Sequence, residues 1–550
     1  MDMATAMSKL SKSLACLNSE RLRWPGLTRV NWHAVALLIA MFVAPQSLLA
    51  QVDLGSSVPT ESSSQGVGSP TGPAGARFVV PRVAISEILT DNATLVSTGK
   101  QSEQITEISP GIRVARSVGR IRGTFDYALT GRFYAQNTSP SSVQNSLNAN
   151  GVVELVEQRA FIDLGAGIGR QTISANGVQA ASGQVVATNQ AESTNVRISP
   201  YLRGRLSQWA DYELRYSFSN SASNGVTASQ VGTRETRLAL TSNPTGARLG
   251  WTLNASTGGS SYSAARTTEV DALSAGLTYA FTPQLNFSAT LGSESNNYLT
   301  VDKVTNTTTG MGLTWAPTTL TQIALNRQIR PFGETFGINL STRGPRTVWQ
   351  YSDIQDVSTT PAQSSTGSLG NVYNIYYAQF EAVEPDPIKR AALVEAFLQA
   401  NGINPKATVI GNFLTSAVSL QRRQTLSLAL LGVRSTVTFL ASRTATSRLD
   451  SISTAIDDLS NSSLVQQSGF SVNWGHRLTP ESALNLNIAA QNSSSSTGFG
   501  DSSTRSASVG ISTRLGLRTT AVVNARRVVS DSSVTPYNET AITGSVSVQF

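Results

Sequence analysis

Three residues of this 550-residue chain belong to the types that most often carry nucleophilic or metal chemistry: Cys16, His33 and His476. Cys16 and His33 lie before residue 50, in a segment with the features of a removed export signal. A chain left with one His and no Cys cannot form a disulfide, a thiolate nucleophile or a Cys/His zinc site. His476 shares its alternation parity with Trp474, which is typical of a residue facing lipid headgroups. We therefore expect no catalytic residues, no metal site and no cofactor, and a protein that is not an enzyme.

The first 50 residues have the three parts of a secretory signal. Five basic residues precede position 34, an apolar run (AVALLIAMFVA) occupies 34–44, and small residues lead to Ala50. We expect cleavage after Ala50. Residues 51–77 are rich in Gly, Ser and Pro and have no periodicity, which predicts a flexible periplasmic tether.

The composition excludes several classes of protein. Charged residues make up 14% of the chain and hydrophobic residues 40%, whereas ordinary globular chains carry about 25% charge. No apolar run reaches the ~18 residues of a membrane-spanning helix. Without the predicted signal, 37 Lys and Arg remain against 32 Asp and Glu, and this net charge of +5 is too mild to indicate a nucleic-acid partner. A repeat array, a multi-sandwich protein and a transmembrane barrel remain.

From residue 78 onward, apolar and polar residues alternate with the period of two that is typical of β-strands. Short turn signals follow one end of these segments, and longer loops rich in Ser, Asn and Thr, such as 136–146, 220–232 and 491–504, follow the other. Alternation alone would also suit a soluble sandwich, but regularly alternating short and long connections are typical of transmembrane β-barrels. We predict an all-β, antiparallel transmembrane barrel of about 22 strands, an even number between 18 and 24, over residues 78–550.

The C-terminus ends on a strand with Val546, Val548 and Phe550 on one face. This ending resembles the closing strand of bacterial outer-membrane barrels, which the barrel-assembly machinery recognises. We expect these three residues to close the barrel and to direct its assembly.

One stretch, 358–413, departs from the alternation. Within it, 386–402 is predicted as a helix, because Asp386 suits the N-cap, Pro387 the first turn and Gly402 the C-terminal stop. The helix either folds into the pore as a plug or decorates the surface. We favour the inserted element, since its apolar stripe must be buried somewhere.

Assigning the polar face of each strand to the lumen gives an excess of arginine over acidic residues. An arginine-rich wall lowers the barrier for anionic solutes such as an acidic polysaccharide. Alternatively, these arginines pair with lumenal acids and rigidify the barrel. Four of them, Arg122, Arg132, Arg203 and Arg248, are predicted near strand centres. The full set of pore-lining candidates is Arg122, Asp126, Arg132, Arg203, Arg205, Arg215, Arg248 and Arg514.

Five tryptophans lie close to short turns, where an interfacial aromatic girdle would place them. Sugar-stacking platforms are the other interpretation, which we disfavour because several share the parity of the apolar face. The five are Trp209, Trp251, Trp315, Trp349 and Trp474.

Several loose motifs resemble the PEP-CTERM-system-associated outer-membrane protein family: PRVAISEILTDN at 81–92, ITEISPGIRV at 105–114, RTVW at 346–349 with Tyr351, the segment around Asp386-Pro387, and LGVRSTV at 431–437. The resemblance covers about residues 78–550 and implies a barrel in the bacterial outer membrane of an exopolysaccharide producer. The activity of that family is not established, and together with the arginine-rich lumen the resemblance favours a conduit or accessory factor for exopolysaccharide export. The implied partners are outer-membrane lipid, the barrel-assembly machinery, anionic polysaccharide and export proteins. A general porin or small-solute channel is the alternative, and an outer-membrane hydrolase is less favoured.

Overall fold

The computed structural model describes the barrel residues and only a few positions of the long excursion. The described ranges are 78–116, 119–178, 189–224, 230–242, 248–263, 266–358, 418–449, 457–497, 500–533 and 535–550, with single positions 373, 376, 377, 380, 390, 394, 413 and 415. The predicted signal and tether lie outside the described residues, as does most of the predicted helix 386–402.

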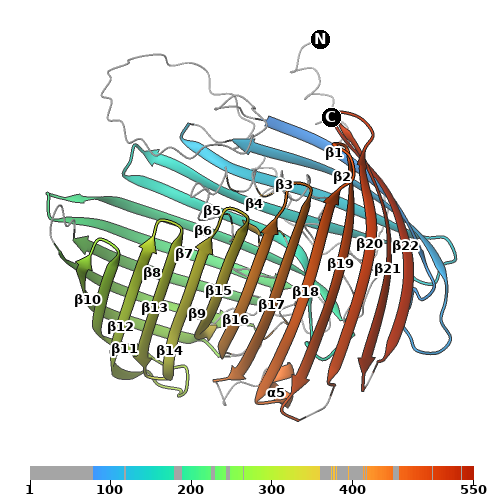
Figure 1. Cartoon of the computed structure of the whole chain (residues 1–550). Coiled ribbons are helices and arrows are strands. Elements are labelled where there is room, and N and C mark those ends of the chain that lie inside the picture. The colour runs from blue at the N-terminus through green and yellow to red at the C-terminus, as the bar shows by residue number, and fades with distance from the viewer. Residues whose placement is uncertain are drawn as a thin grey trace, which may run out of the picture. The chain divides into compact units, whose positions relative to one another are not determined.

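Twenty-two antiparallel strands form one closed sheet, which confirms the predicted barrel and strand number (Figure 1). Each strand pairs with the next, and β1 pairs with β22 to close the barrel. The strands are β1 Phe78–Thr90, β2 Glu103–Arg116, β3 Ile121–Tyr134, β4 Ser142–Val156, β5 Ala160–Thr172, β6 Gln190–Leu206, β7 Ala210–Ser223, β8 Gln230–Ser242, β9 Leu249–Tyr262, β10 Thr268–Thr282, β11 Leu285–Asn296, β12 Val304–Thr318, β13 Thr321–Arg330, β14 Gly333–Arg343, β15 Thr347–Ser358, β16 Ser419–Leu431, β17 Ser435–Arg448, β18 Leu464–Arg477, β19 Ser482–Ser495, β20 Ser502–Arg514, β21 Thr519–Ser532 and β22 Tyr537–Gln549.

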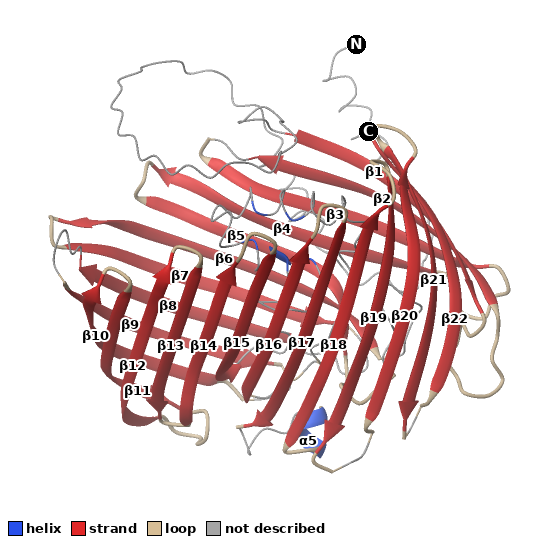
Figure 2. Ribbon diagram, viewed as in Figure 1, coloured by secondary structure: helices blue, strands red, loops and turns tan. Residues whose placement is uncertain are grey.

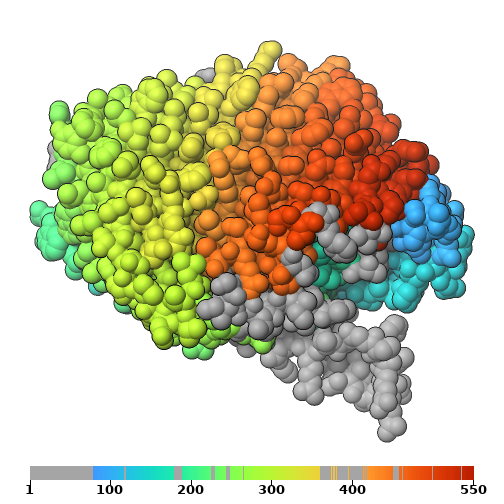
Figure 3. Space-filling model, turned by 90° about the horizontal axis from the view of Figure 1, so that it is seen from below, coloured from blue at the N-terminus to red at the C-terminus, as the bar shows by residue number. Residues whose placement is uncertain are grey.

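The outer face of the sheet carries exposed apolar side chains. On β10, for example, Leu273 and Leu277 are 54% and 57% exposed, while the alternate residues point into the barrel. A closed sheet pairs all of its backbone polar groups and can therefore cross the hydrocarbon layer of a membrane. Leucines exposed on the outside of such a sheet face the lipid. The wall in view in Figure 3 is continuous from the green strands to the red ones. The protein is therefore a barrel of the bacterial outer membrane.

Helical structure is scarce in the part of the chain that the structure describes (Figure 2). The short helix α5 (Asp458–Asn461) lies between β17 and β18, and the Asp457 side chain caps it by accepting a hydrogen bond from the Ser460 amide at 3.0 Å. None of the described helices is long and apolar enough to cross a membrane.

Several segments predicted as loops are partly strand. β4 already begins at Ser142, β7 continues to Ser223 and β19 continues to Ser495, so the predicted loops 136–146, 220–232 and 491–504 were too long. Polar residues can remain in a ladder above the lipid, because backbone pairing does not require an apolar face. The strands consequently extend further on the long-loop side than the alternation indicated.

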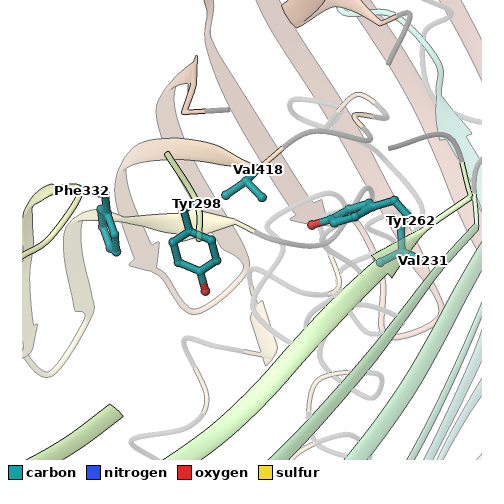
Figure 4. Close-up of a cluster of buried hydrophobic side chains, with 5 residues drawn as sticks. All are labelled: Val231, Tyr262, Tyr298, Phe332 and Val418. Atoms are coloured by element: carbon teal, nitrogen blue, oxygen red, sulfur yellow. The ribbon is translucent and has the colours of Figure 1, made fainter. Parts of the chain in front are cut away.

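One connection on the long-loop side is short, between β13 and β14. Gly333 adopts a φ of +131° there, a conformation open to glycine and strained for side-chain-bearing residues. The preceding Phe332 packs in a buried cluster with Val231, Tyr262, Tyr298 and Val418 (Figure 4). This cluster joins the ends of β8 and β9 to the approach to β16.

The tryptophans lie near the short turns on the outer face. Trp209 is 58% exposed, and its ring centroid lies 6.0 Å from that of Trp251. The ring centroids of Trp474 and His476 are 5.8 Å apart, and His476 Nδ1 lies 2.7 Å from Ser435 Oγ on the neighbouring strand. This placement is that of an interfacial girdle.

Candidate functional site

The lumen is the candidate site, and part of the excursion between β15 and β16 lies in it. Thr438 on β17 points inward, because its neighbour Phe439 shares the outward face with Val472 and the exposed Ile488. Tyr376 is buried and its hydroxyl is hydrogen-bonded to Thr438 Oγ1. Thr438 is the fourth residue of a strand that begins at a short turn. The excursion leaves β15 at the long-loop end of the barrel. At Tyr376 it has therefore reached the third of the wall that is nearest the short turns.

Other described positions of the excursion are also buried. Arg390 and Val394 are helical and buried, and the Arg390 guanidinium lies 4.9 Å from the ring centroid of Tyr377. These are the two positions of the predicted helix 386–402 that the structure describes. Because both positions are buried, they favour a helix inserted into the barrel over a helix on its surface.

The excursion is fastened again at the long-loop rim. Phe413 forms a parallel bridge with Thr172 at the end of β5, and it packs in a buried cluster with Ala175, Leu459 and Val465. Thr415 Oγ1 donates a hydrogen bond to Asp457 Oδ2 at 2.8 Å. The rim therefore holds the excursion where the chain approaches β16.

Two of the predicted pore-lining residues are engaged in ion pairs on the inner face. Asp126 accepts two hydrogen bonds from Arg82, at 2.9 and 2.5 Å. Arg132 pairs with Glu107 at 2.5 Å, and both side chains are largely buried. These pairs correspond to the alternative in which wall arginines rigidify the barrel.

A second group of predicted residues lies on the inner face of β6 and β7. Arg215 contacts Asp163 at 2.6 Å and Glu213 at 2.9 Å. Arg205 and Asp211 form a more exposed pair at 3.3 Å. The outward Leu202 and Leu214 of these strands are paired with each other, which places the alternate residues in the lumen.

Arginines and aromatic rings stack in this part of the wall. The Phe161 and Tyr201 rings stack with centroids 5.1 Å apart. The Arg203 guanidinium lies 4.4 Å from the Phe161 centroid, and that of Arg215 lies 4.0 Å from the Tyr201 centroid. The sequence analysis missed both rings, although Tyr201 is two residues from Arg203 and shares its parity.

The remaining predicted arginines lie at the short-turn mouth. Arg122 is the second residue of β3, Arg248 directly precedes β9, and Arg514 is the last residue of β20. Among the described residues, none of these three side chains has an acidic partner within 4.0 Å. Their charge is therefore not cancelled locally.

The predicted position near strand centres was wrong. Arg122, Arg203 and Arg248 lie near the short turns, whereas Arg132 is two residues from the long-loop end of β3. Alternation fixes the face of the sheet on which a side chain lies, but not its height along the strand, which depends on where each strand begins and ends.

Further charges line the lumen beyond the eight predicted candidates. Arg526 pairs with Glu539 at 2.9 Å, and Arg330 pairs with Glu294 at 2.7 Å; all four side chains face inward and are largely buried. Parity in the sequence already places Arg526 in the lumen, whereas Arg330, Glu294 and Glu539 were not predicted. No sequence signal showed which acid would meet which base. The described residues contain no group of three His, Cys, Asp or Glu that could hold a metal ion.

The closing strand meets β1 as its sequence suggests. Val546 pairs with Ile85 and Val548 with Val83, and the Phe550 amide donates a hydrogen bond to the Pro81 carbonyl at 2.9 Å. The Phe550 side chain is exposed on the outside of the barrel.

No family model and no curated protein matches the sequence. Solved structures with similar folds include the siderophore receptor PirA from Pseudomonas aeruginosa (8% identity, 86% of this chain and 80% of that one, TM-score 0.42). The FrpB iron transporter from Neisseria meningitidis is 10% identical over 86% of this chain and 82% of that one, with a TM-score of 0.46. The alcaligin outer membrane receptor FauA from Bordetella pertussis is 11% identical over 85% and 76%, with a TM-score of 0.37. At these identities the likeness concerns the fold alone.

Proposed function

We propose that this outer-membrane barrel is a conduit or accessory factor for the export of an acidic exopolysaccharide. The observation that carries the proposal is the set of lumenal arginines at the short-turn mouth, Arg122, Arg248 and Arg514, that have no acidic partner among the described residues. Short turns mark the periplasmic end of such barrels. A positive mouth on that side attracts a polyanion arriving from the periplasm.

The chemistry of the wall suits a carboxylated sugar polymer. Arginine remains charged at any physiological pH and can bind a carboxylate through two parallel hydrogen bonds. The stack of Arg203, Phe161, Tyr201 and Arg215 adds aromatic surface next to fixed positive charge. Positive charge near a constriction lowers the barrier for anions more than for neutral solutes.

The described positions of the excursion support a partly filled conduit over an open pore. Tyr376 is buried against Thr438 deep in the barrel, and Phe413 is buried at the rim. A general porin or small-solute channel is the second candidate, favoured by the same arginines if anions of any size pass. The proposed role is transport, with no catalytic step.

The test has two parts. In the source bacterium, deletion of the gene should leave acidic polysaccharide in the periplasm, and the variant R122Q/R248Q/R514Q should complement poorly. In planar bilayers, a polyuronate added on the short-turn side should block the ion current of the wild type, and neutral dextran should not.

The matched control removes the same number of charges from the outer wall, through R443Q/R505Q/R527Q, and should restore export in full. Normal polysaccharide secretion by the deletion strain, with an unblocked anion current, would favour the small-solute channel instead.

A further inference from the structure

An arginine-rich strip crosses the lipid-facing surface of β16 to β21. On these adjacent strands, the outward residues nearer the short turns are apolar, and Phe470, Ile488 and Val523 are 43%, 44% and 60% exposed. Higher on the same face the outward residues become Arg443, Arg505 and Arg527, on β17, β20 and β21.

The strand register shows that these arginines point outward. Arg505 pairs with Ala490, which in turn pairs with the exposed Phe470. Arg527 pairs with Ala507, which lies opposite the exposed Ile488. Side chains opposite each other in a ladder share one face of the sheet.

Arg443 follows the same rule on β17. It is exposed, whereas the next residue, Thr444, is buried and therefore faces inward. Two residues below Arg443, Ala441 pairs with Phe470 on the outer face.

The strip lies at the upper edge of the apolar band. Each of the three arginines is the ninth or tenth residue from the short-turn end of its strand. At ~3.3 Å per residue and a tilt of ~40°, that is about 20–23 Å of height, close to the ~25 Å of an outer-membrane apolar band. This is the level of the polar headgroups of the external leaflet.

Among the described residues, no carboxylate forms an ion pair with the three arginines of the strip. In the part of the chain that the structure describes, Arg505 and Arg527 have no ion-pair or hydrogen-bond partner, and Arg443 donates only to Gln466 Oε1 at 3.1 Å. The nearby outward Arg422, by contrast, is bound by Asp353 at 3.0 and 2.7 Å. Asp531 is exposed on the same face and is the diagonal neighbour of Arg505 on the side away from Arg527, but its carboxylate forms no ion pair.

Arg505 and Arg527 are diagonal neighbours, since Arg505 lies opposite Val529 and Arg527 opposite Ala507. Diagonal residues on adjacent strands are ~7–8 Å apart, and like charges at close range repel. An anion bound between the two guanidinium groups would attract both of them and would offset their mutual repulsion.

Other sectors differ at this height. Leu273 on β10 and Ile198 on β6 are outward and apolar there. Arg234 on β8 is a single outward arginine, and Arg327 on β13 is paired with Glu334 at 2.5 Å. Among the described residues, the grouped outward arginines without ion pairs are therefore those of β17, β20 and β21. β18 and β19 lie between β17 and β20, and Ser468 and Ala490 are the residues opposite Arg443 and Arg505 on them.

We infer that Arg443, Arg505 and Arg527 form a binding site for the phosphate groups of a phosphorylated glycolipid in the external leaflet. Guanidinium and phosphate form short, charge-assisted and often bidentate hydrogen bonds. The apolar residues below, such as Phe470 and Val523, would contact the acyl chains of the same lipid. This site is on the outer wall and does not depend on the role proposed for the lumen.

The test measures binding of a diphosphorylated lipid A to the purified, detergent-refolded barrel, for example by native mass spectrometry. The variant R443Q/R505Q/R527Q should bind about tenfold more weakly and lose most of the salt dependence. The control R122Q/R203Q/R248Q removes three lumenal charges and should bind like the wild type.

A dephosphorylated lipid A distinguishes phosphate recognition from contact with the acyl chains, and it should bind the wild type as weakly as the triple variant binds lipid A. Equal affinity of wild type and R443Q/R505Q/R527Q for lipid A, with both shown to be folded by their gel mobility before boiling, would overturn the inference. Equal affinity for both lipids would do so as well.

Discussion

Thr90 and Glu539 stand 449 positions apart in the chain and form a hydrogen bond across the seam where β1 meets β22. Thr90 Oγ1 donates to Glu539 Oε1 at 2.7 Å, and the same carboxylate oxygen accepts a hydrogen bond from Arg526 at 2.9 Å. Because Glu539 and Arg526 are largely buried, the first and last strands are joined by a charged network as well as by their ladder.

We expect E539Q to weaken the barrel more than T90V. The first change leaves Arg526 buried without a counter-charge, and breaking a buried pair costs about 3–5 kcal/mol. T90V removes one hydrogen bond and should cost about 1–3 kcal/mol. The urea midpoint of the change in gel mobility would measure both, and R205Q, which removes an exposed pair, should shift it little. A larger shift for R205Q than for E539Q would contradict this ranking.

Deletion of Phe550 should reduce the yield in the outer membrane and leave protein in the periplasm. The deletion removes the backbone hydrogen bond to Pro81 and the terminal aromatic residue. Membrane fractionation measures the effect, and F550Y, which retains the aromatic ring and the backbone, is the control. A full yield without Phe550 would show that the closing strand is recognised without it.

R132Q and R122Q should differ sharply, although both replace an arginine of β3 by glutamine. R132Q strips the largely buried Glu107 of its partner and should destabilise the barrel by about 3–5 kcal/mol. R122Q breaks no ion pair and should fold normally while lowering anion selectivity. Unfolding midpoints and reversal potentials separate the two effects. Similar unfolding midpoints would mean that the Arg132 pair contributes little.

Removal of residues 386–402 should raise the single-channel conductance. The described positions Arg390 and Val394 are buried, and emptying the lumen widens the path for ions. Y376F, which removes only the hydroxyl bound to Thr438, should increase the frequency of brief openings with a smaller effect on conductance. Unchanged conductance in the deletion variant would place the segment outside the ion path.

Docking between the β5–β6 and β17–β18 loops should weaken as the pH rises. Asp458 accepts a hydrogen bond from the Ala175 amide at 2.6 Å. Burial raises the pKa of the Asp458 carboxyl, against smaller opposing effects of the hydrogen bonds from Ser174 and Ala175.

A carboxyl whose pKa is higher in the docked state takes up a proton on docking. Docking is therefore most favourable below the ordinary value of about 3.9 and loses stability as the pH rises through the raised pKa. Hydrogen exchange of the Ala175 amide, corrected for its intrinsic rate, should show protection falling over that window. D458N should abolish the pH dependence, and an unchanged profile in D458N would assign it to another group.

The sequence by itself determined the barrel. A period of two, short and long connections in turn, and a terminal strand ending at Phe550 predicted a closed sheet, because side chains that alternate between lipid and lumen leave a pattern that needs no knowledge of distant contacts. The same parity assigned Arg203, Arg205 and Arg215 to the inner face, where the register places them.

The tertiary structure decided which charges meet. Arg132 and Glu107 are 25 positions apart, and Thr90 and Glu539 are 449 apart; both contacts depend on register and closure, which alternation leaves open. Strand length above the lipid was also undetermined, because a polar ladder there has no hydrophobic pattern. Contacts between distant residues also show only in the folded barrel. Examples are the contact of Tyr376 with Thr438 and the lack of acidic partners, among the described residues, for Arg122 and Arg248 at the mouth.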